Sequence, residues 1–149
     1  MNVKSKRAIW FEVGFSYIKT MASGLQKRVR EKFVFDGQDF LEAYTKAMEY
    51  ADGMMEEYAV ITMAIAPYAE YVRCDDREGE ALHLYKVKLA FVVFDERTGK
   101  EKKSYATILV LAESITESRE ITVEYMRGTL ADYAIESIIK TALVEVIDK

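Results

Sequence analysis

The sequence predicts an α+β protein, in which tandem duplicated strand-strand-helix-strand units form a mostly antiparallel sheet of about six strands with two helices on one face. Residues 49–59 read EYADGMMEEYA and residues 124–134 read EYMRGTLADYA, near copies that lie 75 positions apart. When residues 24–74 are aligned with 99–149, nine of the 51 positions are identical. That is roughly three times the identity expected for unrelated sequences of ordinary composition.

The alternation of apolar and polar residues predicts the first two strands. In AIWFEVGFSYIKT, four apolar residues alternate with small or polar ones: Phe11, Val13, Phe15 and Tyr17. After the turn MASGLQ, a second alternating segment directs Val29, Phe33 and Phe35 inward. A period of two with one apolar face is typical of a half-buried strand, so this pair predicts a hairpin.

Two helices follow from their end signals. Each begins with a capping-box pair, in which a cap oxygen accepts a free backbone N–H three residues on: Asp39 with Glu42, and Ser114 with Glu117. Each is expected to stop at a glycine that takes a left-handed cap, Gly53 and Gly128. The expected buried stripe of the first helix is Phe40, Tyr44, Ala47, Met48 and Ala51. The expected stripe of the second is Ile115, Thr122, Val123 and Met126.

The second half repeats the hairpin. In LYKVKLAFVVFDE the inward set is Tyr85, Val87, Leu89 and Phe91. After the turn DERTGK, the inward set is Ala106, Ile108 and Val110. An extended segment follows each helix, YAVITMAIAPYAEYV and then YAIESIIKTALVEVI, and Pro67 predicts a bulge or edge position in the first. We therefore expect a single domain over 1–149, with pseudo-repeats at about 8–72 and 82–147 joined by a linker at 73–81.

Composition and local sequence patterns indicate the cellular compartment of the protein. The chain has 149 residues, a formal net charge of −4 and one cysteine, Cys74, which cannot form an internal disulfide. No stretch approaches the ~18 apolar residues of a spanning helix, and the basic start MNVKSKRAIW lacks the apolar core of a secretion signal. These features predict a cytoplasmic protein with no membrane partner.

Several motifs also resemble a known family. They are WFE at 10–12, KTM and GLQK within 19–27, DERTGKEKK at 95–103, and GTLADY at 128–133. Together they resemble an uncharacterised family, catalogued only as a domain of unknown function, whose members occur in Bacteroidetes bacteria, their phages and mobile elements. The resemblance covers about Ala8 to Val146 and is poorest around PYAEYVRCDDREGE. It implies a cytoplasmic, phage-borne context and no established activity.

No catalytic pattern is present in the sequence. It has no phosphate-binding glycine loop, and its single histidine, His83, excludes a histidine-rich metal site within one chain. Asp75, Asp76, Glu78 and Glu80 lack the spacing of a calcium loop and are typical of a solvated acidic linker. We therefore expect no catalytic residues, no metal and no cofactor, and a protein that is not an enzyme.

One surface carries a more specific pattern. Projected onto the outward faces of the hairpins, positive charge and aromatic rings gather on the sheet, and the candidate nucleic-acid-binding residues are Arg28, Arg30, Lys32, Lys86, Lys88, Lys103, Tyr105 and Trp10. Such sheets can hold single strands, because phosphates need cations and bases need flat partners. The plain alternative is that exposed strands carry Lys and Arg to stay soluble and to block edge pairing.

The predicted function is a small non-catalytic binding protein, an accessory single-stranded nucleic-acid-binding protein of phage or mobile-element origin that uses this basic sheet face. The rival hypothesis is a protein-interaction or host-defence-modulating module, which binds a host protein or sequesters a small anionic ligand. A homo-oligomer is compatible with both. A salt-sensitive interaction with oligonucleotides favours the first hypothesis.

Overall fold

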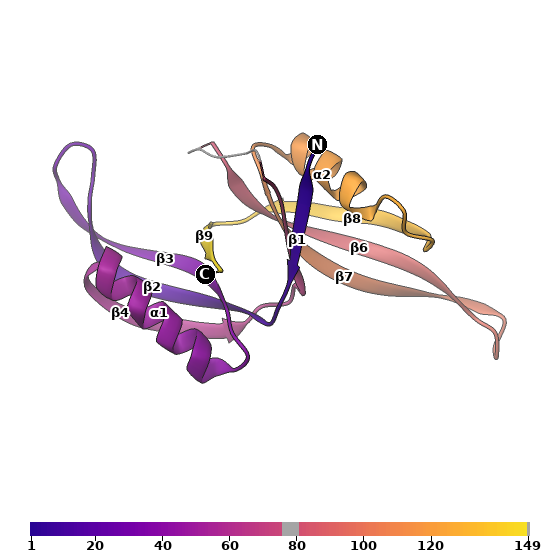
Figure 1. The fold of residues 1–149 in the computed structure, drawn as a ribbon, viewed down its shortest axis with the longest axis horizontal. Helices are drawn as coiled ribbons and strands as arrows, with labels where there is room; N and C mark the ends of the chain where they lie inside the picture. Colours follow the sequence, from indigo (N-terminus) through magenta and orange to yellow (C-terminus); the bar gives the residue numbers. More distant parts are fainter. Residues whose placement is uncertain (76–80, 149) are drawn as a thin grey trace. The chain divides into compact units, whose positions relative to one another are not determined.

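A computed structural model describes residues 1–75 and 81–148. In this part of the chain there are nine strands and two helices (Figure 1). In chain order they are β1 (Val3–Arg7), β2 (Trp10–Thr20), β3 (Gln26–Asp36), α1 (Phe40–Met54), β4 (Glu56–Ile65), β5 (Glu70–Cys74), β6 (His83–Asp95), β7 (Lys100–Ala112), α2 (Ile115–Met126), β8 (Tyr133–Lys140) and β9 (Leu143–Ile147).

The strands form two sheets, and the chain divides into two compact units. Unit 1 comprises Met1–Arg7 and Tyr68–Thr141, and its sheet has the order β1-β5-β7-β6-β8. Unit 2 comprises Ala8–Pro67 and Ala142–Lys149, and its sheet has the order β4-β2-β3-β9. The predicted α+β class is confirmed, but one sheet of about six strands is not what forms.

The difference arises at the extended segments that follow the helices. Each was expected to be one strand, yet β4 ends at Ile65 and β5 starts at Glu70, so Pro67 separates two strands of different sheets. Proline donates no backbone hydrogen bond, which explains why the ladder stops there. The segment after α2 breaks in the same way between β8 and β9, where the backbone N–H of Thr141 donates to Leu84 at 2.9 Å.

The core of unit 2 is an aromatic sheet face under a helix of small residues. Phe11, Phe15, Phe33 and Phe35 are buried, and α1 places Ala43, Ala47 and Ala51 against them, each fully buried. Alanine at every fourth position brings the helix axis close to the sheet. Tyr50 then fills the remaining space, with its ring 5.5 Å from that of Phe33 and 5.8 Å from that of Phe35.

The core of unit 1 is aliphatic and has the same plan. Val87, Leu89, Ile108 and Val110 from β6 and β7 pack beneath α2 in one cluster with Ile121. The buried face of α2 also includes Ser118, Thr122 and Met126, which lie 75 positions after Ala43, Ala47 and Ala51, the buried residues of α1.

Most inward residues expected on the hairpins belong to these cores. Those expected on the first strand of each hairpin are confirmed as core members or as residues packed against the core. On β7 the expectation holds for Ile108 and Val110, but Ala106 is exposed. Ala106 lies nearer the turn of the hairpin than the two buried residues do.

The helices start as expected, but the predicted stripes need correction. The Asp39 carboxylate accepts the Glu42 N–H at 2.8 Å, and the Ser114 hydroxyl accepts the Glu117 N–H at 3.0 Å. Phe40, Tyr44 and Ile115 are exposed instead of buried. The predicted stripe favoured the larger apolar side chains, whereas the sheet beneath α1 is already filled by aromatic rings and accepts only small ones.

The two glycines at the helix ends differ in conformation. Gly128 has φ of +88°, but it lies one residue beyond the extended C-cap Arg127, at the third position of a type II turn in which the Thr129 N–H donates to the Met126 carbonyl at 3.1 Å. Gly53 lies inside α1, which continues to Met54, and its φ is not positive. The predicted positive φ is therefore correct for Gly128 and wrong for Gly53, and neither helix ends in the predicted left-handed glycine cap.

The two units share their strand registers. Trp10 pairs with Asp36 in the β2–β3 hairpin, and Leu84 pairs with Leu111 in the β6–β7 hairpin, which is the equivalent pair of the second half. The ladder between β2 and β4 shifts after Gly14, and that between β6 and β8 shifts after Lys88, which is the equivalent position. The strand orders β4-β2-β3-β9 and β8-β6-β7-β5 therefore correspond.

This correspondence means that the third strands are exchanged. β5 comes from the first half of the sequence yet pairs parallel with β7, where Tyr71 lies opposite Leu109. β9 comes from the second half yet pairs parallel with β3, where Val146 lies opposite Val34. Each compact unit therefore contains a hairpin and helix from one half and a closing strand from the other.

A tyrosine and a glutamate join each helix to the exchanged strand. The Tyr125 hydroxyl donates to Glu70 at 2.5 Å, and the Tyr50 hydroxyl donates to Glu145 at 3.4 Å. Burial and the hydrogen bond to Glu70 raise the pKa of Tyr125. Burial and the charge of Glu145 likewise raise the pKa of Tyr50. These four residues are two of the pairs that recur in the sequence repeat, so the repetition coincides with a contact.

We expect alanine to have opposite effects at the two glycines. Gly128→Ala should lower the free energy of unfolding by about 1 kcal/mol, because a Cβ disfavours positive φ. Gly53→Ala should raise it by about 0.5–1 kcal/mol, because the position is helical and an added Cβ meets nothing within 4 Å. Urea unfolding measures both, and equal effects at the two sites would contradict the assigned conformations.

We also expect Glu70 to make stability depend on pH. Burial alone would raise the pKa of Glu70, but hydrogen bonds from Tyr125 and Arg7 outweigh burial and lower it below its usual 4.5. The charged form therefore stabilises the folded state at neutral pH, and this contribution is lost as pH falls through the lowered pKa. Glu70→Gln should cost about 1 kcal/mol at pH 7 and progressively less below pH of about 4.5. Glu136→Gln, an exposed position on β8, is the matched control, and a pH-independent difference would contradict the assignment.

Candidate nucleic-acid interface

Each sheet has one face covered by its helix and one that we call the helix-free face. On β3 the core residues Val29, Phe33 and Phe35 point toward α1. Because side chains alternate along a strand, Arg28, Arg30 and Lys32 point to the helix-free face of unit 2. All three are exposed, so the expected row of cations on β3 forms.

The three cations differ in how they are held. The Arg28 guanidinium donates to the Ser16 hydroxyl at 3.1 Å and to the Glu57 carbonyl at 3.2 Å, and it lies 3.5 Å from the Glu57 carboxylate. Among the residues that the structure describes, Arg30 and Lys32 make no ion pair. Arg30 and Lys32 are therefore better placed to meet an anionic ligand than Arg28.

One carboxylate on β3 points the other way. Glu31 lies on the helix side, where it accepts a hydrogen bond from Tyr17 and lies 3.3 Å from the ammonium of Lys19. Burial and this bond raise the pKa of Tyr17. The alternation of the strand thus keeps the negative charge of Glu31 off the face that carries the three cations.

Trp10 does not belong to the candidate site. It was expected to be an outward stacking residue, but its side chain is 0% exposed. Val34 is also fully buried, although it lies on the same helix-free side of β3. The alternation of side chains along a strand tells on which face of the sheet Trp10 lies, but it does not tell whether other residues cover it there. The prediction that Trp10 is exposed was therefore wrong.

The helix-free face of unit 1 lies on the β6–β7 hairpin. Val87 and Leu89 point into the core, so Lys86 and Lys88 point outward on β6. On β7, Ile108 and Val110 point inward, so the outward set includes Lys103 and Tyr105. Lys86 and Lys88 are half-buried, whereas Lys103 is exposed and Tyr105 is 51% exposed.

Two lysines on this face contact tyrosine rings. The ammonium of Lys88 lies 4.5 Å from the ring centroid of Tyr105, which is a cation–π distance. The ammonium of Lys86 lies 5.8 Å from the ring of Tyr68, a buried residue. Lys88 therefore fixes a positive charge beside an exposed aromatic ring, which is the combination that single-stranded nucleic acid requires.

The structure adds an aromatic residue that the sequence reading missed. Phe94 lies on the same face of β6 as Lys88, and it is 61% exposed. It sits four residues beyond Ala90, the partner of Tyr105, so the two rings are separated by about 13 Å along the hairpin. Lys103 and its partner Val92 lie between them. Side chains alternate along β6, so Lys88, Ala90, Val92 and Phe94 lie on one face. Extending the predicted outward set along the strand would therefore have included Phe94.

This hairpin extends beyond its neighbours. β6 and β7 pair from His83 to Asp95, whereas β8 pairs with β6 only as far as Phe91. Figure 1 shows the two strands continuing together as a long hairpin past β8 and α2. Phe94 and Val92 therefore lie on a two-stranded arm, which leaves their side chains accessible.

The candidate cations repeat at one position. Arg28 corresponds to Lys103 on the second strands of the two hairpins, since Ile18 pairs with Arg28 and Val92 pairs with Lys103. The other positions differ, because Lys88 corresponds to Gly14, Lys86 to Glu12 and Tyr105 to Arg30. The expected matching of the two basic groups therefore holds for the face and for the pair Arg28 and Lys103, but not for the remaining positions.

Two further features are absent from the described residues, a metal site and a membrane-spanning helix. Within residues 1–75 and 81–148, no group of three or more His, Cys, Asp or Glu side chains could hold a metal ion. Asp76, Glu78 and Glu80 of the acidic linker lie outside the described residues. In the part of the chain that the structure describes, no helix is long and apolar enough to cross a membrane.

The fold and these faces define a sheet-dominated α+β protein whose two sheets each carry one helix and one helix-free face with basic residues. Residues 9–149 match the family described as a domain of unknown function, DUF4494, and the chain belongs to this family. This confirms membership of an uncharacterised domain family. No match was found among curated proteins or among solved structures.

Proposed function

We propose that this protein is a small, non-catalytic, accessory binding protein for single-stranded nucleic acid. The observation that carries the proposal is the exposed face of the β6–β7 hairpin, where Tyr105 and Phe94 flank Lys103 and where Lys88 lies against the Tyr105 ring. Cations attract the phosphates, and exposed rings stack on unpaired bases.

The distribution of charge supports the same ligand. The overall charge is −4, yet Arg30 and Lys32 lie on one helix-free face and Lys88 and Lys103 on the other. The first turn of each helix carries an acidic residue instead, Glu42 in α1 and Glu117 in α2. A polyanion is therefore attracted to the sheet faces and repelled from the helices, which orients its binding.

The setting that fits this role is the cytoplasm of a bacterium that carries a phage or a mobile element. Such an accessory protein needs no catalytic residues and no cofactor. The rival function is a protein-interaction or host-defence-modulating module that binds a host protein or a small anionic ligand. The two functions differ in one measurable way, because only the first requires affinity for oligonucleotides that falls with salt.

We also infer that residues 8–72 and 82–147 are internal repeats. The equal hairpin registers, the shared shift in the outer ladder and the paired Tyr–Glu contacts support this inference. A repeat would supply two similar sheets from one gene. The basic residues of their helix-free faces then coincide at Arg28 and Lys103 and differ at the other positions.

The central test of function is fluorescence anisotropy with a labelled single-stranded oligonucleotide at several salt concentrations. Arg30→Ala combined with Lys32→Ala should weaken binding by about tenfold and should flatten the salt dependence by about 0.7 per lost contact. Tyr105→Ala and Phe94→Ala should each weaken binding by about tenfold without changing the slope, because stacking releases no counterions. All four side chains are exposed, so melting midpoints should hardly change.

The matched control removes two positive charges elsewhere. Arg119→Ala combined with Arg127→Ala changes the net charge by the same amount at and just after α2, where both side chains are exposed. This variant should bind almost as well as the unmodified protein. Absence of oligonucleotide binding at low salt would overturn the proposal, as would equal losses in the control and the β3 variant.

A further inference from the structure

The two sheets differ in one strand, and this difference exposes an edge. In unit 1, β1 pairs antiparallel with the outer edge of β5, with Arg7 opposite Glu70 and Val3 opposite Cys74. Unit 2 has four strands, and β9 takes the place that β5 has in unit 1. In the described part of the chain, no strand pairs with the other edge of β9.

The strand that covers β5 is basic, and its partners are acidic. β1 reads VKSKR. The Arg7 guanidinium lies 2.9 Å from Glu70, and the Lys4 ammonium lies 2.6 Å from Asp75. Backbone pairing and charge therefore act together at this edge.

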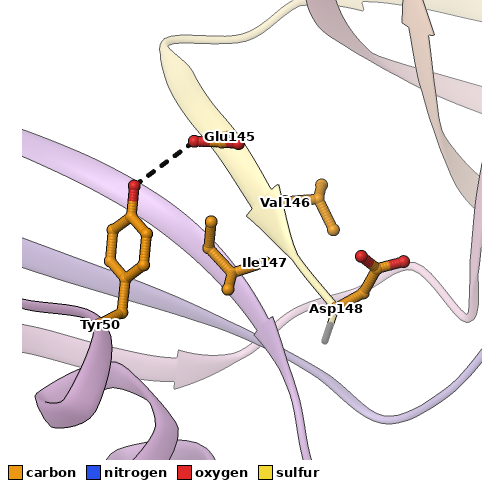
Figure 2. A pocket seen from close by; sticks show the side chains of 5 residues that line it. All are labelled: Tyr50, Glu145, Val146, Ile147 and Asp148. Carbon is orange, nitrogen blue, oxygen red and sulfur yellow. Dashed lines mark hydrogen bonds between the residues drawn. The ribbon is translucent and has the colours of Figure 1, made fainter. Parts of the chain in front are cut away.

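One residue of β9, Glu145, reproduces the acidic partner that Arg7 has in unit 1. Glu145 is the repeat equivalent of Glu70, and it accepts a hydrogen bond from Tyr50 just as Glu70 does from Tyr125. Figure 2 shows the Tyr50 hydroxyl and the Glu145 carboxylate joined by this bond. Glu145 is exposed, and among the residues that the structure describes no lysine or arginine pairs with it.

A cavity lies beside this edge. Its volume is about 340 Å³, and its lining is Tyr50, Glu145, Val146, Ile147 and Asp148 (Figure 2). Four of the lining residues, Glu145 to Asp148, are consecutive. By strand register they correspond to Glu70–Arg73, which β1 covers in unit 1. The cavity in unit 2 is thus at the place where unit 1 holds an added strand.

We propose that the outer edge of β9 binds an extended basic peptide segment of a partner protein, which adds to the sheet of unit 2 as a fifth, antiparallel strand. The segment carries a lysine or arginine opposite Glu145, as β1 carries Arg7 opposite Glu70. Main-chain hydrogen bonds provide affinity, and the Glu145 carboxylate selects for positive charge. A nucleic acid is a poor occupant, because the Glu145 carboxylate repels phosphate.

The probe is a fluorescent peptide with the sequence of residues 2–8, NVKSKRA, which already forms such a strand in unit 1. It is titrated into the full-length protein. Saturable binding is expected, and Glu145→Gln should weaken it by about tenfold. Glu136→Gln, an exposed carboxylate on β8, is the charge-matched control and should have no effect.

Backbone methylation separates strand addition from simple charge attraction. Amides along a strand point alternately toward and away from the neighbouring strand. One peptide is N-methylated at the residues that match Lys4 and Lys6, and a second at those that match Val3, Ser5 and Arg7. One of the two should lose binding by about tenfold or more, whereas the other should retain it.

Three results would overturn the proposal: no saturable binding, equal affinity of both methylated peptides, or equal effects of Glu145→Gln and Glu136→Gln. A fourth is a stable dimer of the unmodified protein in which residues 143–148 are already protected from amide exchange, since a second copy would then cover the edge. The peptide titration uses no oligonucleotide, so failure of oligonucleotide binding and failure of this proposal are separate outcomes.

Discussion

Each sheet depends on a short strand that comes from the other half of the sequence. β5 and β9 have five residues each, and both pair parallel with a strand that is distant in sequence. Their anchors are side chains as well as backbone: Val72 is fully buried in unit 1, and Ile147 packs against the aromatic core of unit 2. Because each core includes residues from both halves, neither half contains a complete sheet by itself.

This constraint also fixes which surfaces remain for binding. The helices are committed to one face of each sheet, since Ala47 and Ile121 are fully buried there. The Tyr–Glu contacts hold each helix to its exchanged strand. The helix-free faces and the edges of the sheets are the remaining surfaces. Basic and aromatic residues gather on the helix-free faces, and β9 presents Glu145 at an edge. Our two proposals therefore assign ligands of opposite charge to different surfaces of the sheets.

The sequence predicted local structure well, because hairpins, helices and caps depend on neighbouring residues. The inward residues of β2 and β6 and the caps at Asp39 and Ser114 are correct for that reason. Long-range features were missed. The segment YAVITMAIAPYAEYV contains no signal that the residues after Pro67 join another sheet. The alternation of side chains likewise could not show that Trp10 is buried. Gly53 illustrates a third limit, since α1 includes this glycine and ends one residue later, at Met54. For the candidate site, parity placed the cations on β3, β6 and β7 correctly, but whether these faces bind nucleic acid depends on a ligand that sequence patterns do not specify.

The exchange of β5 and β9 is tested most directly by inter-strand nuclear Overhauser effects in the isotope-labelled monomer. Our account predicts backbone contacts between Tyr71 and Leu109, and between Val146 and Val34. If each half instead closed its own sheet, the same two strands would show contacts between Tyr71 and Val34, and between Val146 and Leu109. Observation of this second set in a monomer would contradict the strand exchange, and with it the composition of both units.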